Sequence, residues 1–381
     1  MTEYEETFAD QFGFSHGFGF WKGRMALYAV LKGLGIGEGD EIGVPGYTCV
    51  MAVNPIMYVG ATPVFVDIEP VTYNMDPNQI EAKITPKTKL IIAQHTYGYP
   101  ADLDAIMDIA GRKGLPVLED CCLSLGSKYK GKQTGTFGLA AYFSFQWNKP
   151  YTSGLGGMAI TNDRELAERI QRVCEAELLA PRFKKVAMLA MQLVVYRSVI
   201  YPRTTTLAQS IFRWLVSKGL IFGSMSDAEL LPTMEEGFFT GMSSVQARSG
   251  LRQLRRLGRN VAHRRKMRQV YDRLLAERGW NVTQVPEETD PVLVRYPVRV
   301  ADKQRALETA ARHFVELGSW FEVPLHPQGT KLAAYGYRQG MCPEAERASR
   351  EVVNLPMHPR ANEKTARRSV DFVVGVGPAK S

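Results

Sequence analysis

The feature that most constrains the fold is a regular alternation between residues 23 and 161, where short apolar runs are separated by stretches of helical spacing. The runs predicted to be strands are Glu41–Val44, Thr62–Val66, Lys89–Ala93, Pro116–Leu118, Ala140–Phe145 and Met158–Thr161. Helices are predicted over Met25–Leu34 and Asp102–Lys113, because each stretch ends directly before a glycine. Short buried strands separated by helices are typical of a mainly parallel sheet, so we expect an α/β layer structure here.

The pattern changes to long helices after Leu166, and Arg182–Leu231 contains no strand-like run. We interpret about residues 180–235 as a helical insert, a hairpin with its turn at Tyr201–Thr206. Its apolar positions are Val186, Leu189, Leu193, Tyr196, Ile200, Leu207, Ile211, Trp214, Leu215 and Leu220. Basic residues flank these positions. The apolar face is therefore either buried against a dimer partner or laid on a membrane interface through about residues 182–220.

The last third of the chain predicts a second, smaller domain. Its expected elements are a helix over Ser243–Arg278 with a break near Gly258, a strand over Val292–Val300, and helices over Asp302–Gly318 and Pro343–Val353. This mixture is typical of an α+β arrangement. We therefore expect a large domain over residues 1–242, which includes the insert, and a small C-terminal domain over residues 243–381.

Composition excludes several classes of protein. Of the 381 residues, 45% are hydrophobic and 23% charged, as in globular proteins and unlike disordered ones. The five cysteines form no C-x-x-C pair and are too scattered for a disulfide framework, so a reduced, cytoplasmic protein is expected. The longest apolar stretch, Val186–Tyr196, is shorter than the roughly 20 residues that span a membrane. Residues 1–11 carry four acidic side chains and do not resemble a secretory signal.

Three groups of residues that carry chemistry lie where a predicted strand ends or a helix begins. Glu119-Asp120 directly follow a strand, Lys149 follows another among aromatic residues, and Gly23-Arg24 begin a helix. Open parallel sheets bind ligands at the carboxyl ends of their strands. Taken alone, Asp120 is more often a helix cap and Lys149 an exposed charge. A desolvated lysine, however, has a lowered pKa and can form a Schiff base, and a helix start beside an arginine can hold a phosphate.

In their order along the chain, these groups resemble the DegT/StrS family of sugar aminotransferases. The motifs that carry the resemblance are Gly23-Arg24-x-Ala26-Leu27, Pro45-Gly46-Tyr47-Thr48, Gly60–Asp67, His95-x-Tyr97-Gly98, Glu119-Asp120 and Ser144-Phe145-x-x-x-Lys149. The match runs from about Phe8 to Asp163 and resumes at Met242–Leu254 and Cys342–Pro359. The resemblance implies a fold-type I enzyme with a seven-stranded sheet, a homodimer, and the cofactor pyridoxal 5′-phosphate (PLP), which cycles with its amine form (PMP).

The resemblance also implies roles for individual residues. It makes Lys149 the lysine that binds PLP covalently and moves protons, and Asp120 the partner of the pyridine nitrogen. A carboxylate there keeps that nitrogen protonated. The residues implied to hold the cofactor phosphate are Ser144, Gly23, Arg24 and Met25. The residues expected beside the cofactor ring are Tyr47, Cys49 and His95.

Three positions depart from the family pattern. Leu123 stands where the family usually has a glutamine near the cofactor hydroxyl, and Phe239 where it commonly has an asparagine that reaches the partner subunit's phosphate. Cys49 stands where an aromatic residue is often found. His326 and Trp147 are the candidates for substrate contact. No set of His, Cys or carboxylate residues has metal-ligand spacing, so no metal site is expected.

A basic stretch lies between Arg252 and Arg268, with eight basic residues and no acidic one. The net charge of the whole chain is 47 − 39 = +8, so this stretch alone equals it. Interleaved apolar residues give a helical face. The stretch is therefore either a solvated basic face or a surface for an anionic partner, such as a nucleotide diphosphate or an anionic lipid. No recognition motif accompanies the charge, so nucleic acid is not an expected partner.

These observations predict a cytoplasmic PLP-dependent aminotransferase. The resemblance implies transfer from an amino-acid donor, glutamate, to a keto group of a nucleotide-linked sugar, in cell-surface polysaccharide or secondary-metabolite synthesis. One alternative is another PLP reaction, such as elimination or dehydration; Lys149 argues against the dehydratase branch, which has histidine there. The other alternative is a non-catalytic protein that uses the basic helix and the apolar insert at a partner or at the inner membrane surface.

Overall fold

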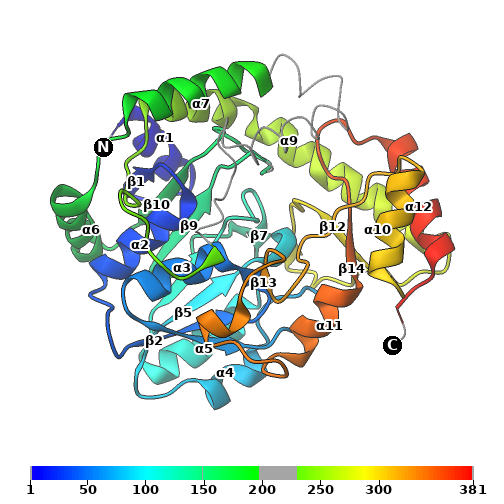
Figure 1. The fold of residues 1–381 in the computed structure, drawn as a ribbon, viewed down its shortest axis with the longest axis horizontal. Coiled ribbons are helices and arrows are strands. Elements are labelled where there is room, and N and C mark those ends of the chain that lie inside the picture. The colour runs from blue at the N-terminus through cyan, green and yellow to red at the C-terminus, as the bar shows by residue number, and fades with distance from the viewer. Residues whose placement is uncertain (1, 148, 197–229, 380–381) are drawn as a thin grey trace.

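The computed structural model describes residues 2–147, 149–196 and 230–379. Its centre is a sheet whose strands lie in the order β1-β10-β9-β6-β5-β2-β4 (Figure 1). The strands are β1 (His16–Phe20), β2 (Glu41–Pro45), β4 (Thr62–Val66), β5 (Thr88–Gln94), β6 (Val117–Asp120), β9 (Ala140–Ser144) and β10 (Gly157–Thr161). Neighbours from β9 to β4 are parallel, whereas β10 runs antiparallel to both β9 and β1. The predicted α/β fold with a mainly parallel seven-stranded sheet is confirmed.

Helices cover both faces of this sheet, which explains the continuous apolar runs of the parallel strands. The covering helices include α2 (Gly23–Gly33), α3 (Val50–Tyr58), α5 (Leu103–Lys113) and α6 (Arg164–Glu177). Leu90 and Ile92 of β5 belong to the hydrophobic core that contains α2. Ile91 and Ala93 belong to the core that contains α5, on the other face. Alternate residues of one strand thus enter two separate cores.

The sequence does not predict β1, because two of its five residues are glycines and no apolar alternation results. The helix α1 (Glu3–Gln11), which packs against this strand, accounts for the glycines. A Cβ atom on Gly17 would lie 2.8 Å from the carbonyl oxygen of Glu5. The N–H of Gly19 donates to the Glu5 carboxylate at 2.7 Å. The close approach of α1 therefore determines the sequence of this edge strand.

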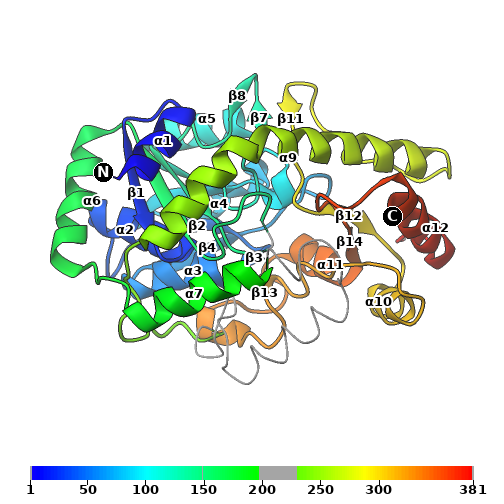
Figure 2. The ribbon, with the colours of Figure 1, turned by 90° about the horizontal axis from the view of Figure 1, so that it is seen from above.

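One long helix, α9 (Ser244–Ala276), connects the sheet to the C-terminal part of the chain (Figure 2). It contacts α1 and, farther along, α12 (Glu363–Val376). Its start is capped by Ser243, whose side chain accepts from the N–H of Gln246 while the Gln246 side chain bonds back to the backbone of Ser243. The predicted break near Gly258 is wrong. The helix is continuous there, because a single glycine lowers helix propensity by only about 1 kcal/mol.

The C-terminal part is a small mixed structure, as predicted. Its elements are the antiparallel strands β12 (Tyr296–Arg299) and β14 (Val352–Leu355) with the helices α10 (Lys303–Arg312), α11 (Pro343–Glu351) and α12. The predicted strand over Val292–Val300 is shorter, because its first residues bond elsewhere. The N–H of Val292 donates to Ser127 Oγ and that of Val294 to the carbonyl oxygen of Tyr97. The domain boundary between residues 242 and 243 stays a prediction.

The first half of the predicted insert is the helix α7 (Phe183–Val195). Leu189 and Leu193 are buried over Gly154, in the turn that follows Lys149. The predicted turn at Tyr201–Thr206 and the second half of the hairpin, up to Leu220, lie outside the described residues. Within residues 2–147, 149–196 and 230–379, no helix is long and apolar enough to cross a membrane.

Candidate active site

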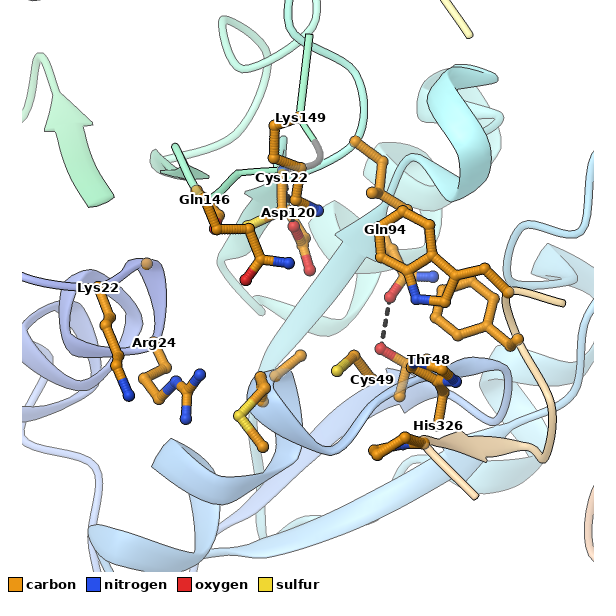
Figure 3. Close-up of a pocket in the computed structure, with 18 of the residues that line it drawn as sticks. Lys22, Arg24, Thr48, Cys49, Gln94, Asp120, Cys122, Gln146, Lys149 and His326 are labelled. Carbon is orange, nitrogen blue, oxygen red and sulfur yellow. Dashed lines mark hydrogen bonds between the residues drawn. The ribbon is translucent and has the colours of Figure 1, made fainter. Parts of the chain in front are cut away.

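A cavity of about 410 Å³ opens at the carboxyl ends of β5, β6 and β9. Its opposite wall comes from the C-terminal part of the chain, through residues 318–321 and the short strand β13 (Leu325–His326). β13 pairs in parallel with β3 (Thr48–Cys49) from the N-terminal part of the chain. The predicted site residues that line the cavity are Gly23, Arg24, Cys49, Asp120, Ser144, Lys149 and His326. Figure 3 labels five of them: Arg24, Cys49, Asp120, Lys149 and His326. Residues from distant parts of the sequence therefore meet in one cavity.

Asp120 is held in place by two hydrogen bonds at the end of β6. Its Oδ1 accepts the backbone N–H of Cys122 at 2.9 Å, and its Oδ2 accepts the hydroxyl of Tyr142 at 2.5 Å. Burial, together with the charge of Asp120, raises the pKa of Tyr142 well above its ordinary value, so the phenol stays a neutral donor. The carboxylate is therefore fixed in orientation at the back of the cavity.

Lys149 lines the same cavity as this carboxylate and is partly buried. Burial lowers the pKa of its ammonium group, although Cys122 and Asp120 act in the opposite direction. Its Nζ lies over the indole of Trp320, 4.7 Å from the ring centroid. A lysine with a lowered pKa is more often in its neutral, nucleophilic form near neutral pH.

The start of α2 forms a tight cradle at one end of the cavity. Lys22 is the N-cap residue and has no side-chain oxygen to cap the helix, and Gly23 and Arg24 begin the first turn. A Cβ atom on Gly23 would lie 2.8 Å from Cβ of Ser144, and one on Gly157 would lie 2.4 Å from Cα of Gly23. Because Gly23 and Gly157 have no side chain, a ligand can come close to the backbone N–H groups at the start of the helix. Helix N–H groups beside cationic side chains suit a phosphate.

The two ends of this cavity together fit PLP. A fixed carboxylate suits a protonated pyridine nitrogen, a lysine with a lowered pKa suits an aldehyde carbon, and the helix start suits a phosphate. Figure 3 shows Lys22 and Arg24 together at one end, with Lys149 and Asp120 away from them. The chemistry of the donor set is thus that of a PLP site.

Three residues predicted at the cofactor lie outside the lining of this cavity. Tyr47 is buried, and its hydroxyl bonds to the hydroxyl of Tyr97 at 2.9 Å. Met25 follows Gly23 by two positions, which turns its side chain about 200° around the helix and into the buried core. His95 is also buried and bonds to Glu119 and to the N–H of Ala101. Trp147 lines a second cavity instead of this one.

His95 belongs to a buried cluster with Glu119 and Cys121, whose potential ligand atoms lie within 4.8 Å of one another. The sequence spacing does not predict this cluster. The Glu119 carboxylate accepts His95 Nε2–H at 3.1 Å and also the backbone N–H groups of Gly135, Phe137 and Gly138. Its oxygens are therefore already satisfied by the protein. We interpret the cluster as a structural support for the loop over residues 135–138.

His326 lines the cavity from β13. Burial lowers its pKa to about 4, so its imidazole is neutral at physiological pH. A neutral imidazole can both donate and accept a hydrogen bond, which suits contact with hydroxyl groups of a substrate.

Sequence reasoning missed several lining residues. Thr48 donates from Oγ1 to Oε1 of Gln94 at 2.5 Å, and Gln94 Nε2 donates to the carbonyl oxygen of Tyr47 at 3.0 Å. Gln94 ends β5, so its position at a strand end was an available signal. Trp320 and Arg295 belong to the C-terminal part, and only tertiary packing brings them here.

Two departures from the family pattern have different consequences. Leu123 lines the cavity, where its side chain cannot donate a hydrogen bond. Phe239 is buried and stacks on Phe20, with 5.6 Å between ring centroids, and packs on Tyr28 at 5.1 Å. At the position where the family pattern has an asparagine that reaches the partner subunit, this chain therefore has a phenylalanine that packs in its own core.

A second cavity of about 480 Å³, which Lys149 also lines, is strongly basic. Its cationic side chains include Arg256, Arg259, Arg264, Arg295 and Arg360. One acidic residue, Glu316, also lines it, and its carboxylate accepts His358 Nε2–H at 2.9 Å. Part of the basic stretch of α9 therefore faces a cavity, and Lys149 and Arg295 line both cavities.

The fold and the lysine–aspartate cavity define a PLP-dependent enzyme of the transaminase class. More specifically, the chain belongs to the DegT/DnrJ/EryC1/StrS aminotransferase family, whose model matches residues 1–195 and 207–374. The predictions of the family, of PLP or PMP as cofactor and of sugar aminotransferase activity are confirmed.

Two named proteins are similar to this chain over nearly its whole length. One is the pleiotropic regulatory protein of Geobacillus stearothermophilus, 33% identical over 94% of this chain and 84% of that protein. Another is the UDP-2-acetamido-2-deoxy-3-oxo-D-glucuronate aminotransferase of Pseudomonas aeruginosa, 31% identical over 94% of this chain and 86% of that protein. Among solved structures, S. venezuelae DesV is 28% identical, with a TM-score of 0.74 over 98% of this chain and 89% of the other.

Proposed function

We propose that this aminotransferase moves an amino group from glutamate to a keto group of a nucleotide-linked sugar. The observation that carries the proposal is the position of Lys149 and Asp120 in a cavity that adjoins a second, basic cavity. The name of the similar Pseudomonas aeruginosa protein, which specifies a UDP-linked keto sugar, supports the choice of substrate class.

Asp120 and the start of α2 would hold the cofactor at its two ends. Asp120, oriented by Tyr142 and by the N–H of Cys122, would face the pyridine nitrogen and keep it protonated. The first turn of α2 and the Arg24 guanidinium would bind the phosphate. PLP, when bound, supplies an electron sink for the pair released from the carbon that carries the amine.

Lys149 is the residue that we assign to covalent attachment and proton transfer. Its Nζ would take the proton from the amine-bearing carbon of the donor. In the second half of the reaction it would deliver a proton to the carbon of the acceptor sugar that gains the amine. Burial lowers the pKa of Lys149, which keeps more of the side chain in the neutral form that can accept a proton. The indole of Trp320 covers Nζ and reduces contact with water on that side.

The second cavity supports a nucleotide-linked acceptor. A diphosphate carries two or more negative charges, and Arg256 and Arg259 line this cavity without lining the first one. Lys149 lines both cavities, so a sugar attached to a diphosphate in the second cavity would have a path to the reacting lysine.

The test is the absorbance spectrum of PLP-loaded protein before and after addition of glutamate, with Lys149→Ala beside the wild type. We expect a visible band of lysine-bound PLP in the wild type that glutamate removes and that a keto-sugar nucleotide then restores. Lys149→Ala should lack this band. If glutamate leaves the wild-type band unchanged while another amino acid removes it, the donor assignment is wrong. If no amino acid removes it, the transamination proposal fails.

We further propose a cytoplasmic homodimer whose interface includes α7. The side chains of Phe183, Met191, Val194 and Val195 on this helix are exposed, and the Phe183 side chain is 84% exposed. Such an apolar stripe is typical of a contact surface. Size-exclusion chromatography with light scattering should give twice the chain mass, and Met191→Glu with Val194→Glu should shift it toward the monomer. Binding of the wild type, but not of this variant, to anionic liposomes would favour a membrane contact instead.

A further inference from the structure

The guanidinium of Arg295 is a cation of the active site that forms no ion pair within the described part of the chain. Its side chain lines both cavities and is partly buried. Among residues 2–147, 149–196 and 230–379, it makes no hydrogen bond or ion pair. The carboxylate whose charge acts on it is that of Glu316, which already pairs with His358. Burial lowers the pKa of Arg295, and the charge of Glu316 opposes this shift without cancelling it.

The backbone that carries Arg295 is fixed from both sides. The buried Arg264 guanidinium donates from one nitrogen to the carbonyl oxygens of Leu293 and Val294, at 2.8 and 3.1 Å. The N–H of Val294 donates to the carbonyl oxygen of Tyr97 at 2.9 Å. Directly after Arg295, β12 pairs with β14. The arginine is thus presented to the cavity by a preorganised backbone, which lowers the entropic cost of binding a ligand.

The other cations that line the first cavity in the described structure are Lys22, Arg24 and Lys149. Lys22 and Arg24 lie together at the start of α2, at the end assigned to the phosphate (Figure 3). Lys149 carries the chemistry itself. Arg295 is close enough to Lys149 for its charge to contribute to the lowered pKa of that lysine. It is therefore the cation left for an anionic group of a substrate that reacts at Lys149.

The chemistry of the donor identifies that group. An amino-acid donor carries a carboxylate on the same carbon as the amine that it gives up, and a guanidinium can bind a carboxylate through two parallel hydrogen bonds. We propose that Arg295 binds the α-carboxylate of the amino-acid donor and thereby selects amino acids over simple amines; this rests on the proposed transamination. The acceptor's negative charges lie on its nucleotide, for which Arg256 and Arg259 of the second cavity are available.

Binding can be measured without turnover by using glutarate, which is glutamate without its amine. Calorimetric titration of PLP-loaded wild type, Arg295→Lys, Arg295→Met and a control, Arg305→Met on the exposed face of α10, separates charge from geometry. Loss of one partner from an enclosed charge pair corresponds to about 100-fold in affinity. We therefore expect about 100-fold weaker binding for Arg295→Met, a smaller loss for Arg295→Lys, and no change for Arg305→Met. Unchanged binding by Arg295→Met overturns the proposal.

The half-reaction identifies which substrate the arginine serves. In Arg295→Met, the glutamate concentration that removes half of the PLP absorbance should rise about 100-fold. The corresponding concentration of butan-2-amine should not change, because this amine has no carboxylate. The KM for the keto-sugar nucleotide should also stay within about threefold of the wild type. A raised KM for the sugar nucleotide with normal glutamate use would assign Arg295 to the acceptor and contradict the proposal.

Failure of the proposed function itself would look different. In that case no amino acid would remove the absorbance band of the wild type, whereas the glutarate titration would still measure whether Arg295 binds a carboxylate. The PLP band of each variant reports that the protein is folded and loaded. Arg295→Lys keeps a positive charge in the cavity and serves as the second variant if Arg295→Met does not fold.

Discussion

The hydroxyl of Tyr142 donates a hydrogen bond to Oδ2 of Asp120 at 2.5 Å, from the strand that neighbours Asp120 in the sheet. The two residues are directly opposite in the register of β6 and β9. The sheet itself therefore sets this contact. The orientation of the carboxylate is determined before any ligand arrives, as electrostatic preorganisation requires.

Tyr142→Phe is expected to weaken PLP binding about 10-fold. A hydrogen bond to a charged group contributes about 1.5–3 kcal/mol, and about 1.4 kcal/mol corresponds to a factor of ten. Fluorescence titration of cofactor-free protein with PLP measures the affinity. The control is Tyr151→Phe, which removes a buried hydroxyl bonded to Tyr4 at 2.7 Å, outside the cavity lining. Equal PLP affinities for Tyr142→Phe and the wild type would contradict the role given to Tyr142.

Lys149→Met is expected to stabilise the cofactor-free protein near neutral pH. Because burial lowers the pKa of Lys149 in the folded state, the unfolded chain binds more protons between that pKa and the ordinary value of 10.5. Wild-type stability should therefore rise with pH across this window. The gain in Tm from Lys149→Met should be largest near pH 7 and should shrink as pH approaches 10.5. A gain that is independent of pH, or a loss at pH 7, would argue against a desolvated lysine.

Gly157→Ala is expected to destabilise the fold by about 1–3 kcal/mol, because the added methyl group overpacks the contact with Gly23. It should also weaken PLP binding, because this clash displaces the start of α2. The new Cβ would lie 2.4 Å from Cα of Gly23. Urea denaturation measures the free energy of unfolding. Gly258→Ala is the matched control, since no atom beyond its chain neighbours and the adjoining helix backbone lies within 4 Å of its added Cβ. This control should stabilise α9 by up to about 1 kcal/mol. Equal stability of the two variants would contradict the packing argument.

Arg264→Met is expected to cost about 2–4 kcal/mol of stability, because the carbonyl oxygens of Leu293 and Val294 lose their donor. It should also weaken glutamate binding, since Arg295 follows these residues. Arg273→Met, on the same helix, removes a half-exposed ion pair with Glu363 and should cost less than about 1 kcal/mol. Chemical denaturation and the glutamate half-reaction measure both effects. Normal glutamate use by a folded Arg264→Met protein would show that Arg264 does not position Arg295.

The central sheet could be predicted well because each buried parallel strand is apolar on both faces. Asp120, Ser144 and Lys149 could be placed near one another for the same reason, since each lies at or shortly after the carboxyl end of a strand. Met25 is predicted at the site because it is adjacent in sequence to Gly23 and Arg24, but the helical turn directs its side chain into the core. His95 stands at a strand end as well, yet its partner is the buried Glu119.

The residues that the sequence could not predict come from the C-terminal part of the chain. Arg295 and Trp320 have no local pattern that indicates a ligand. Their positions result from long-range contacts, such as those of Arg264 and Tyr97 with the segment before β12. β1 escaped prediction because its glycines reflect a contact with α1 and not a strand propensity.

The most direct test of the account is to find where PLP is attached. The PLP-loaded protein is reduced with borohydride, digested, and mapped by mass spectrometry, with Asp120→Asn treated in parallel. We predict that the reduced pyridoxyl phosphate mass is found on the peptide that contains Lys149 and on no other lysine peptide. Asp120→Asn should carry much less of it at the same PLP concentration. Attachment at a different lysine, or equal random labelling of several, would contradict the assignment of this cavity as the active site.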